Sequence, residues 1–241
     1  MPGQQIGFGR RALRLIPMVL VVAAAAPAAA AERGYSVTQF DRIRVEGPFE
    51  VTVATGKPVS ARATGSEEAL ERVSLRVEGQ TMLIRPNLSG WGGYPGRQAP
   101  PARITLSTPE LNSVILIGSG SLAADRMRGP RVTVTVEGAG RVSVGAIEAD
   151  NASLAVAGSG TIEAAGRTTK AAALARGTAE IRASRLDVTD LVLTSQSAGN
   201  VEMSATRSAK ITSFGAGATE VVGNAKCEVN QAGSGPVRCG R

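Results

Sequence analysis

The sequence contains no histidine, and aromatic residues make up only 3% of its 241 residues. Without histidine, the chain cannot build a Ser-His-Asp triad or a histidine-ligated zinc site. The only lysines, Lys57, Lys170, Lys210 and Lys226, stand in no catalytic motif, and no Gly-Lys-Ser/Thr of a phosphate loop follows the glycine-rich stretches. We therefore predict no catalytic residues, no metal site, no bound cofactor and no enzymatic activity.

Long apolar runs are also scarce, and the one that is present lies near the N-terminus. Arg10, Arg11 and Arg14 precede the apolar stretch from Leu15 to Ala26, and Ala29-Ala30-Ala31 follows it. This order is typical of a secretory signal peptide with a small-residue cleavage site. We assign residues 1–31 to a signal peptide, and expect a mature chain that begins near Glu32 and has no transmembrane segment. The predicted location is the periplasm, the cell surface or the extracellular space.

Basic runs with interleaved aromatic residues are missing as well. The formal net charge is +7, and removal of the three signal arginines leaves +4, because residues 1–31 hold no acidic residue. Such a mild excess is weak evidence for an anionic partner, and no nucleic-acid interface is predicted.

Cysteine occurs twice, at Cys227 and Cys239. Because exported proteins meet an oxidising environment, we predict a disulfide between these two residues. Closing a loop of this size stabilises the fold by roughly 3 kcal/mol in the chain-entropy model.

A small tripeptide recurs along the second half of the chain. Successive final glycines are 20, 20, 17, 22, 18 and 18 residues apart, which indicates a unit of about 19 residues. The copies are Gly118-Ser119-Gly120, Gly138-Ala139-Gly140, Gly158-Ser159-Gly160, Ala175-Arg176-Gly177, Ser197-Ala198-Gly199, Gly215-Ala216-Gly217 and Gly233-Ser234-Gly235.

Apolar residues alternate with polar ones on both sides of each tripeptide. The position four residues before it is occupied by Val114, Val134, Leu154, Ala171, Leu193, Ile211 and Val229. Period-two alternation predicts short strands with one face inward, and stacking of successive coils buries that face. We predict an all-β, parallel β-helix-like solenoid; a β-sandwich is less favoured because sandwiches lack a fixed short period.

Residues 32–110 show the same alternation with irregular spacing, and we predict that they form irregular coils and the N-terminal cap. Within them, Ser66 and the acidic residues that follow predict a short helix from Glu67 to Val73. Residues 111–241 form the repeat solenoid, and residues 32–241 are expected to be one continuous domain.

The segment from Phe40 to Val53, the Gly-Ser-Gly repeats and the closing Gly-Ser-Gly-x-Val-Arg-Cys-Gly resemble the head GIN-domain family of autotransporter adhesins. The resemblance covers residues 36 to 240. It implies a parallel β-helix-like fold and an extracytoplasmic location, and it supplies no catalytic residues. Nothing after the repeats resembles a membrane barrel.

Glutamates recur in one outward position after the tripeptide. The position holds Ala123, Ser143, Glu163, Glu180, Glu202, Glu220 and Arg238. Stacked coils would place the four glutamates about 5 Å apart. This acidic stripe is either a solvated face or a surface for a cation or a basic partner.

A second candidate is the loop from Ser89 to Pro101, which holds the only tryptophan. Trp91 and Tyr94 could stack on a sugar ring, with Arg97 as a hydrogen-bond donor. Alternatively, Trp91 packs over an exposed edge of the cap.

We therefore predict an exported cell-envelope binding or adhesion-like module. Its ligand would be an envelope or extracellular glycan or protein. One alternative is a structural solenoid that self-associates through its edge strands as a homo-oligomer. The other is a carbohydrate-active enzyme, and the lack of a catalytic base counts against it.

Overall fold

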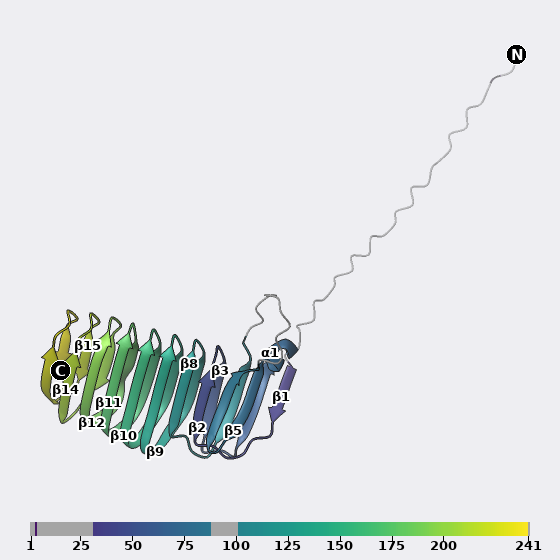
Figure 1. Ribbon diagram of the computed structural model, residues 1–241, viewed down its shortest axis with the longest axis horizontal. Coiled ribbons are helices and arrows are strands. Elements are labelled where there is room, and N and C mark those ends of the chain that lie inside the picture. Colours follow the sequence, from purple (N-terminus) through teal and green to yellow (C-terminus); the bar gives the residue numbers. More distant parts are fainter. Residues whose placement is uncertain (1–2, 4–30, 88–100, 241) are drawn as a thin grey trace.

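The computed structural model describes residue 3 and residues 31–87 and 101–240 of the chain. Strands make up 71% and helices 3% of the structure, which places the protein in the all-β class, with a β-solenoid of about six turns. Figure 1 shows the coils stacked side by side along the long axis, with α1 near one end and β14 and β15 near the other. The predicted parallel β-helix-like solenoid is confirmed.

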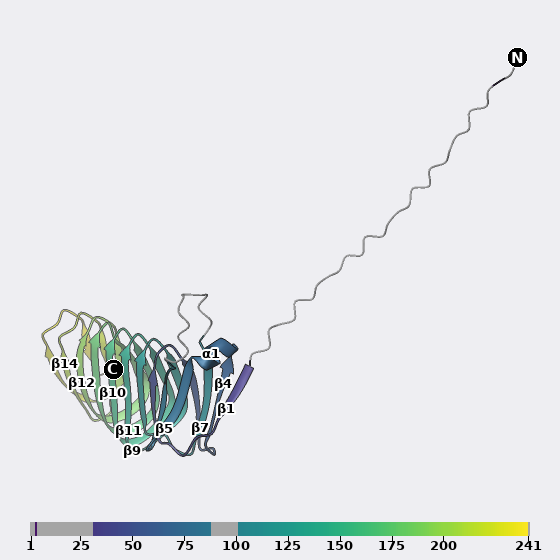
Figure 2. The same ribbon diagram turned by 45° about the vertical axis from the view of Figure 1, so that its right-hand side comes forward.

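Each regular coil has two walls. Strand β9 (Ser121–Gly138) follows one wall, turns a corner near Gly129 and returns along the other. Strands β10 (Arg141–Gly158), β11 (Thr161–Gly177) and β12 (Glu180–Ser197) do the same. We call the wall after the tripeptide the first wall (residues 121–128 in β9) and the wall before the next tripeptide the second wall (residues 132–138). Figure 2 shows the coils as nested loops.

The sequence predicts two short strands in each coil, whereas β9 to β12 are continuous strands of 17 or 18 residues. The corner opposite the tripeptide keeps one register between β9 and β10, whereas the pairings of β11 with β10 and with β12 contain a register shift there. Parallel ladder hydrogen bonds can therefore follow the chain around the corner in the pairing of β9 with β10, from Arg126 to Arg131.

The structure corrects the position of the fourth repeat by two residues. Gly138 pairs with Gly158, Gly158 with Gly177, and Gly177 with Ser197. The turn that follows Gly158-Ser159-Gly160 is therefore Gly177-Thr178-Ala179, and not the predicted Ala175-Arg176-Gly177. The reason is conformational, because Gly177 has a φ of 91°, in the left-handed region that Gly158 also occupies at 119°. The inward column then contains Ala173 in place of Ala171.

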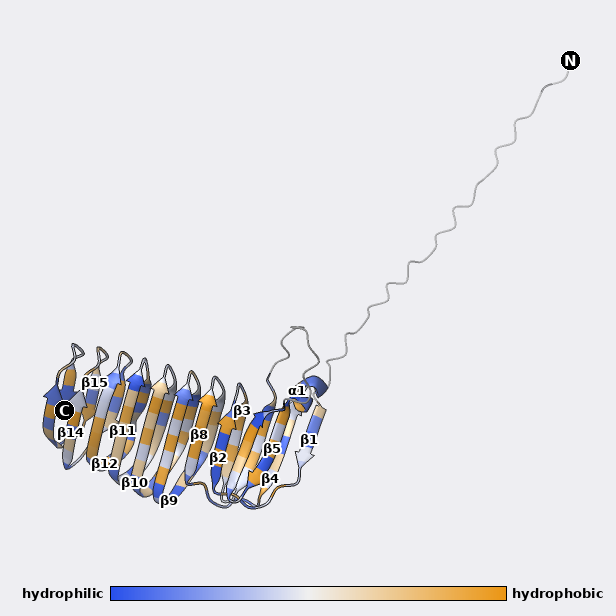
Figure 3. Ribbon diagram, viewed as in Figure 1, coloured by the Kyte–Doolittle hydropathy of each residue, from blue (hydrophilic) through white to orange (hydrophobic). Residues whose placement is uncertain are grey.

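The inward side chains form a single core. Buried hydrophobic residues form one cluster that extends from Phe40 to Val221. Val134, Leu154, Leu193 and Ile211 are each fully buried, as the repeat predicts. Figure 3 shows the alternation of apolar and polar residues along the strands. Burial of these ladders supplies the main stabilisation of the solenoid, since an isolated coil cannot cover its own apolar face.

The C-terminal coils are divided into shorter strands. The first wall continues through β13 (Val201–Ser204), β15 (Thr219–Val222) and β17 (Val237–Cys239), and the second wall through β14 (Ser208–Ser213) and β16 (Lys226–Gln231). Cys227 of β16 and Cys239 of β17 form the predicted disulfide, which ties the two walls of the last described coil together.

The N-terminal coils are not stacked in sequence order. Strand β2 (Arg42–Glu46) lies between β6 (Thr81–Pro86) and β8 (Ser113–Gly118), parallel to both. Strand β3 (Glu50–Thr55) lies between β7 (Arg103–Thr108) and β9. The coil formed by β2 and β3 is therefore inserted between coils that follow it in the chain.

Antiparallel strands complete this end. Strand β4 (Ser60–Gly65) pairs with β7, β1 (Ala31–Tyr35) with β4, and β5 (Val73–Glu78) with β6. Helix α1 (Glu67–Glu71) connects β4 to β5; it is shorter than predicted, because Val73 already begins β5. Ser66 caps the helix by accepting a hydrogen bond from the Ala69 N–H, and Leu70 is 2% exposed.

Candidate binding surfaces

The interior of the solenoid is filled by side chains, so a ligand would bind on the outer surface. The inward positions of both walls are filled by packed aliphatic side chains that belong to the single core cluster. A close-packed interior of this kind has no room for a bound molecule. Among the described residues, no group of three or more His, Cys, Asp or Glu side chains could hold a metal ion.

The predicted acidic stripe does not contain four successive glutamates. Glu163 pairs with Arg182, whereas Glu180 pairs with Thr161, two residues before the column. The correct outward column is Ala123, Ser143, Glu163, Arg182, Glu202, Glu220 and Arg238. The prediction placed Glu180 in the column because it assigned the fourth turn two residues too early.

Arginines neutralise two of the four glutamates. Arg141 Nη1 lies 2.8 Å from Glu163 Oε1, and Arg182 Nη1 lies 3.1 Å from the same oxygen. Arg182 Nη2 also lies 2.8 Å from Glu180 Oε1, and its hydrogen bond to Glu180 raises the pKa of the guanidinium. Glu202 and Glu220 remain adjacent, with Arg238 next in the column. The first wall is thus a mixed-charge surface and not a continuous acidic one.

Trp91, Tyr94 and Arg97 lie outside the described residues, which end at Asn87 and resume at residue 101. Most of the predicted signal peptide, residues 1–2 and 4–30, lies outside them as well. The predicted ligand contacts at this loop stay predictions.

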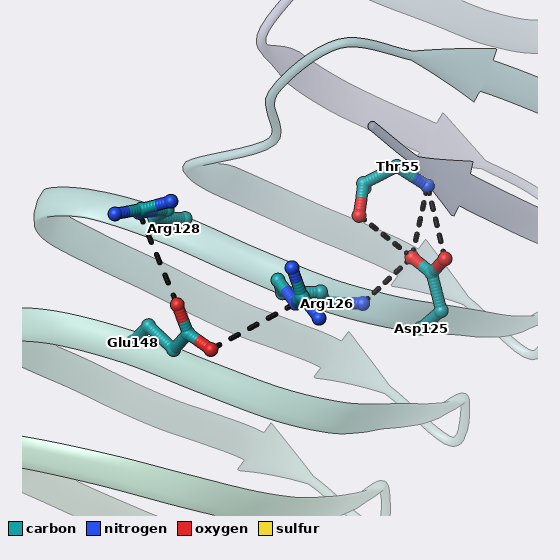
Figure 4. A network of polar contacts seen from close by, with 5 residues as sticks. All are labelled: Thr55, Asp125, Arg126, Arg128 and Glu148. Carbon is teal, nitrogen blue, oxygen red and sulfur yellow. Dashed lines mark hydrogen bonds and ion pairs between the residues drawn. The ribbon is translucent and has the colours of Figure 1, made fainter. Parts of the chain in front are cut away.

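Charged residues at the corner between the walls are paired between coils (Figure 4). Asp125 of β9 accepts hydrogen bonds from the Thr55 N–H at 2.9 and 3.1 Å and from the Thr55 hydroxyl at 2.9 Å. Glu148 of β10 lies 3.8 Å from Arg126 Nε and 3.9 Å from Arg128 Nε. These contacts join β3 to β9 and β9 to β10.

The same corner alternates in sign along the stack. Arg128, Glu148, Arg167 and Asp187 occupy one column of four coils. Further on, Asp190 accepts hydrogen bonds from Arg207 Nε at 2.8 Å and from the Ser208 hydroxyl at 2.7 Å. The hydrogen bond from Arg207 lowers the pKa of Asp190 to about 2. Because opposite charges alternate between coils in this column, the corner favours one stacking register.

The outer face of the second wall carries an uncharged strip that sequence reasoning missed. It consists of two neighbouring columns whose members are half-buried or exposed, with Val192 54% exposed. The uncharged strip comprises Ser113, Thr133, Ser153, Ala172 and Val192 in one column and Ile115, Thr135, Ala155, Leu174, Thr194 and Thr212 in the other.

Charged residues surround the strip. Arg42 and Arg44 of β2 precede it in the two columns, and Lys210 and Glu228 follow Val192 in the first. At a rise of about 3.3 Å per residue and about 4.8 Å between coils, the strip is roughly 7 Å wide and 24 Å long. The sequence does contain a pattern that could have predicted the uncharged strip. Before each turn, uncharged residues, many of them small or hydroxyl-bearing, alternate with the inward residues.

The fold and the distribution of charge are those of a solenoid with external surfaces, and the sequence agrees with a known family. It matches the family model described as "Putative auto-transporter adhesin, head GIN domain" over residues 39–225. The chain belongs to this family. The resemblance predicted from the opening segment and the repeats is thereby confirmed. Membership of the head GIN-domain family indicates an exported or surface protein that binds a ligand.

Solved structures share the fold. A "putative adhesin" from Bacteroides fragilis superimposes with a TM-score of 0.78 at 19% identity, covering 88% of this chain and 98% of the other. A "putative adhesin" from Parabacteroides merdae gives 0.66 at 15% identity, with 88% and 96% covered. A "putative lipid binding protein" from Parabacteroides distasonis gives 0.63 at 22% identity, with 88% and 97% covered. At these identities the likeness concerns the fold alone. No curated protein matches the chain.

Within the described part of the chain, no helix has the length and apolar character needed to cross a membrane.

Proposed function

We propose that this head GIN-domain protein is an exported, non-catalytic binding module of the cell envelope, and that the uncharged strip on the second wall holds its ligand. The observation that carries the proposal is the contrast between the two walls. The first wall and the corner carry charged side chains, some of them paired between coils, whereas the strip presents only methyl and hydroxyl groups over six coils.

The chemistry of the strip favours an uncharged ligand surface. A charged group placed on it would lose water without gaining an ionic partner, which costs free energy. Methyl groups of Val192, Leu174 and Ile115 supply apolar contact, and the threonine hydroxyls supply donors and acceptors at regular spacing. A neutral stretch of glycan or a flat protein surface meets these requirements.

The protein from Parabacteroides distasonis that is named for lipid binding suggests a third class of ligand. A lipid inside this solenoid would have to displace the packed core, so a lipid could contact only the outer surface. Binding of phospholipid vesicles is therefore the comparison that separates this class from the other two.

A matched pair of substitutions tests the site. Ala155 lies in the strip, and Ala123 lies in the outward column of the first wall. We expect Ala155→Arg to weaken binding at least tenfold, because it places an unpaired charge in the contact, and Ala123→Arg to leave binding unchanged. The readout is binding of the labelled protein to a glycan array and to cell envelopes from the organism that encodes it.

Equal losses in the two variants would refute the strip as the site. Trp91→Ala, in the same assay, tests the predicted aromatic contact, and a loss confined to this variant would move the site to the Ser89–Pro101 loop. Cell fractionation with N-terminal sequencing tests export, with a mature chain expected to begin near Glu32. Turnover of a polysaccharide by the wild type would contradict the non-catalytic role.

A further inference from the structure

The two ends of the solenoid are closed to different degrees. At the N-terminal end, α1 contacts both β4 and β5, and its Leu70 covers the core at 2% exposure. At the C-terminal end, β16 and β17 are the last strands of their walls, and no other described strand pairs with their outer edges. Figure 1 shows α1 near the N-terminal end, where β1 is the outermost strand, and strands alone at the other end.

An apolar inward position is uncovered at this C-terminal end. Val229 continues the inward column of Leu193 and Ile211, both fully buried, yet it is 44% exposed. Beside it, the outer-edge N–H and C=O groups of β16 are left without strand partners. Strand edges of this kind pair readily with another strand unless proline, a bulge or charge prevents it. β16 contains no proline, Lys210 neutralises its Glu228 at a distance of 3.1 Å, and its other charged residue, Lys226, lies at the first position of the strand.

We propose that this end binds a second copy of the chain, end to end, with β16 antiparallel to the partner's β16 and Val229 on the twofold axis. The strand is complementary to itself in this register. Glu228 lies opposite the partner's Asn230, so no like charges are directly opposed. In this register, paired residues of the two copies are separated by an even number of positions in the sequence. Their side chains therefore point to the same face of the sheet, and inward side chains lie opposite inward side chains.

The first wall fits the same axis. The disulfide places Cys227 of β16 across the core from Cys239 of β17. The two walls run in opposite directions. Val229, two residues after Cys227, therefore faces Val237, two residues before Cys239. A twofold axis through Val229 therefore also passes near Val237, and the four valines of two copies would close the exposed core. Because this interface is isologous, the assembly closes with two copies.

Exposed valines provide a matched test. Val229 is 44% exposed at the end, and Val192 is 54% exposed on the outer face of the same wall. In sedimentation equilibrium at concentrations from about 1 µM to 1 mM, spanning moderate to weak affinity, we expect the wild type and Val192→Lys to be dimers. Val229→Lys is expected to be monomeric, because it places a charge in the contact. A monomeric wild type, a dimeric Val229→Lys, or oligomers that grow beyond two copies would overturn the proposal.

A second variant tests the register. Directly opposed residues of antiparallel strands have Cα atoms about 4.5–5.5 Å apart, within the range of a disulfide. Val229→Cys should therefore give a covalent dimer under oxidising conditions, whereas Val192→Cys should not, as read by non-reducing mass spectrometry with peptide mapping of the linkage. A dimer that forms without this link would show that the paired register is different. The assay requires no ligand, so its outcome is independent of the proposed binding strip.

Discussion

A β-carbon placed on Gly158 would lie 2.5 Å from the carbonyl oxygen of Gly138, the residue stacked on it in the preceding coil. Gly158 also has a φ of 119°, which side-chain-bearing residues rarely adopt. Glycine is therefore required at this position by both the turn and the closeness of the stacking.

We expect Gly158→Ala to lower the free energy of unfolding by about 2–3 kcal/mol, through backbone strain and the contact with Gly138. Ser159→Ala, in the same exposed turn, should change it by less than about 0.5 kcal/mol. Urea denaturation followed by circular dichroism measures both. Equal stability of the two variants would show that the turn tolerates a side chain at Gly158.

The disulfide between Cys227 and Cys239 closes a loop with a sequence separation of 12 at the open end of the stack. Replacing both cysteines with serine should lower the free energy of unfolding by roughly 3 kcal/mol, because the unfolded chain regains the entropy of the open loop. Reduction of the wild type should give a matching loss, and the double variant should not respond to reductant. If the double variant instead shows a separate, partial unfolding transition while global unfolding is unchanged, the disulfide stabilises only the last coil.

Two buried serines of β12 should respond in opposite directions to the same change. The Ser195 side chain is fully buried, and its hydroxyl has no hydrogen-bond partner among the described residues. Ser197 donates to the Ala179 carbonyl at 2.8 Å and accepts from the Gly199 N–H at 2.9 Å. Ser195→Ala should raise the free energy of unfolding by about 1 kcal/mol, and Ser197→Ala should lower it by about 1–2 kcal/mol. Thermal and urea melts test the sign; destabilisation by Ser195→Ala would indicate a missing partner.

Asp190 should contribute to acid unfolding. Its pKa is lowered to about 2 in the folded protein, from an ordinary value of 3.8, by the hydrogen bonds from Arg207 and then Ser208. The folded state therefore binds this proton less readily than the unfolded state. The contribution is fully present above about pH 4 and is lost as pH falls through 2. Asp190→Asn should flatten the pH dependence of stability in this window, whereas Asp150→Asn serves as an exposed acidic control. Parallel pH curves for wild type and Asp190→Asn would contradict the assignment.

The sequence by itself determined the class of fold. Residues such as Val134, Leu154 and Ile211 recur at one turn-relative position, and only stacked coils bury all of them in one ladder. The pairing of Cys227 with Cys239 followed as directly, because the two cysteines lie on either side of the last glycine turn and no other cysteine competes. Family membership was also evident from the opening segment and the repeats.

Tertiary structure alone decided which residues are neighbours between coils. A turn can be assigned two residues early without disturbing the period-two alternation, and this error placed Glu180 where Arg182 stands. The insertion of β2 between β6 and β8 joins segments far apart in the chain, and no local pattern encodes that order. The uncharged strip and the uncovered Val229 arise from the same cause. Whether a residue belongs to the strip, or is covered, depends on which residue of the adjacent coil lies beside it. The hydrogen-bond register between coils sets that neighbour, and the residues of one coil alone do not.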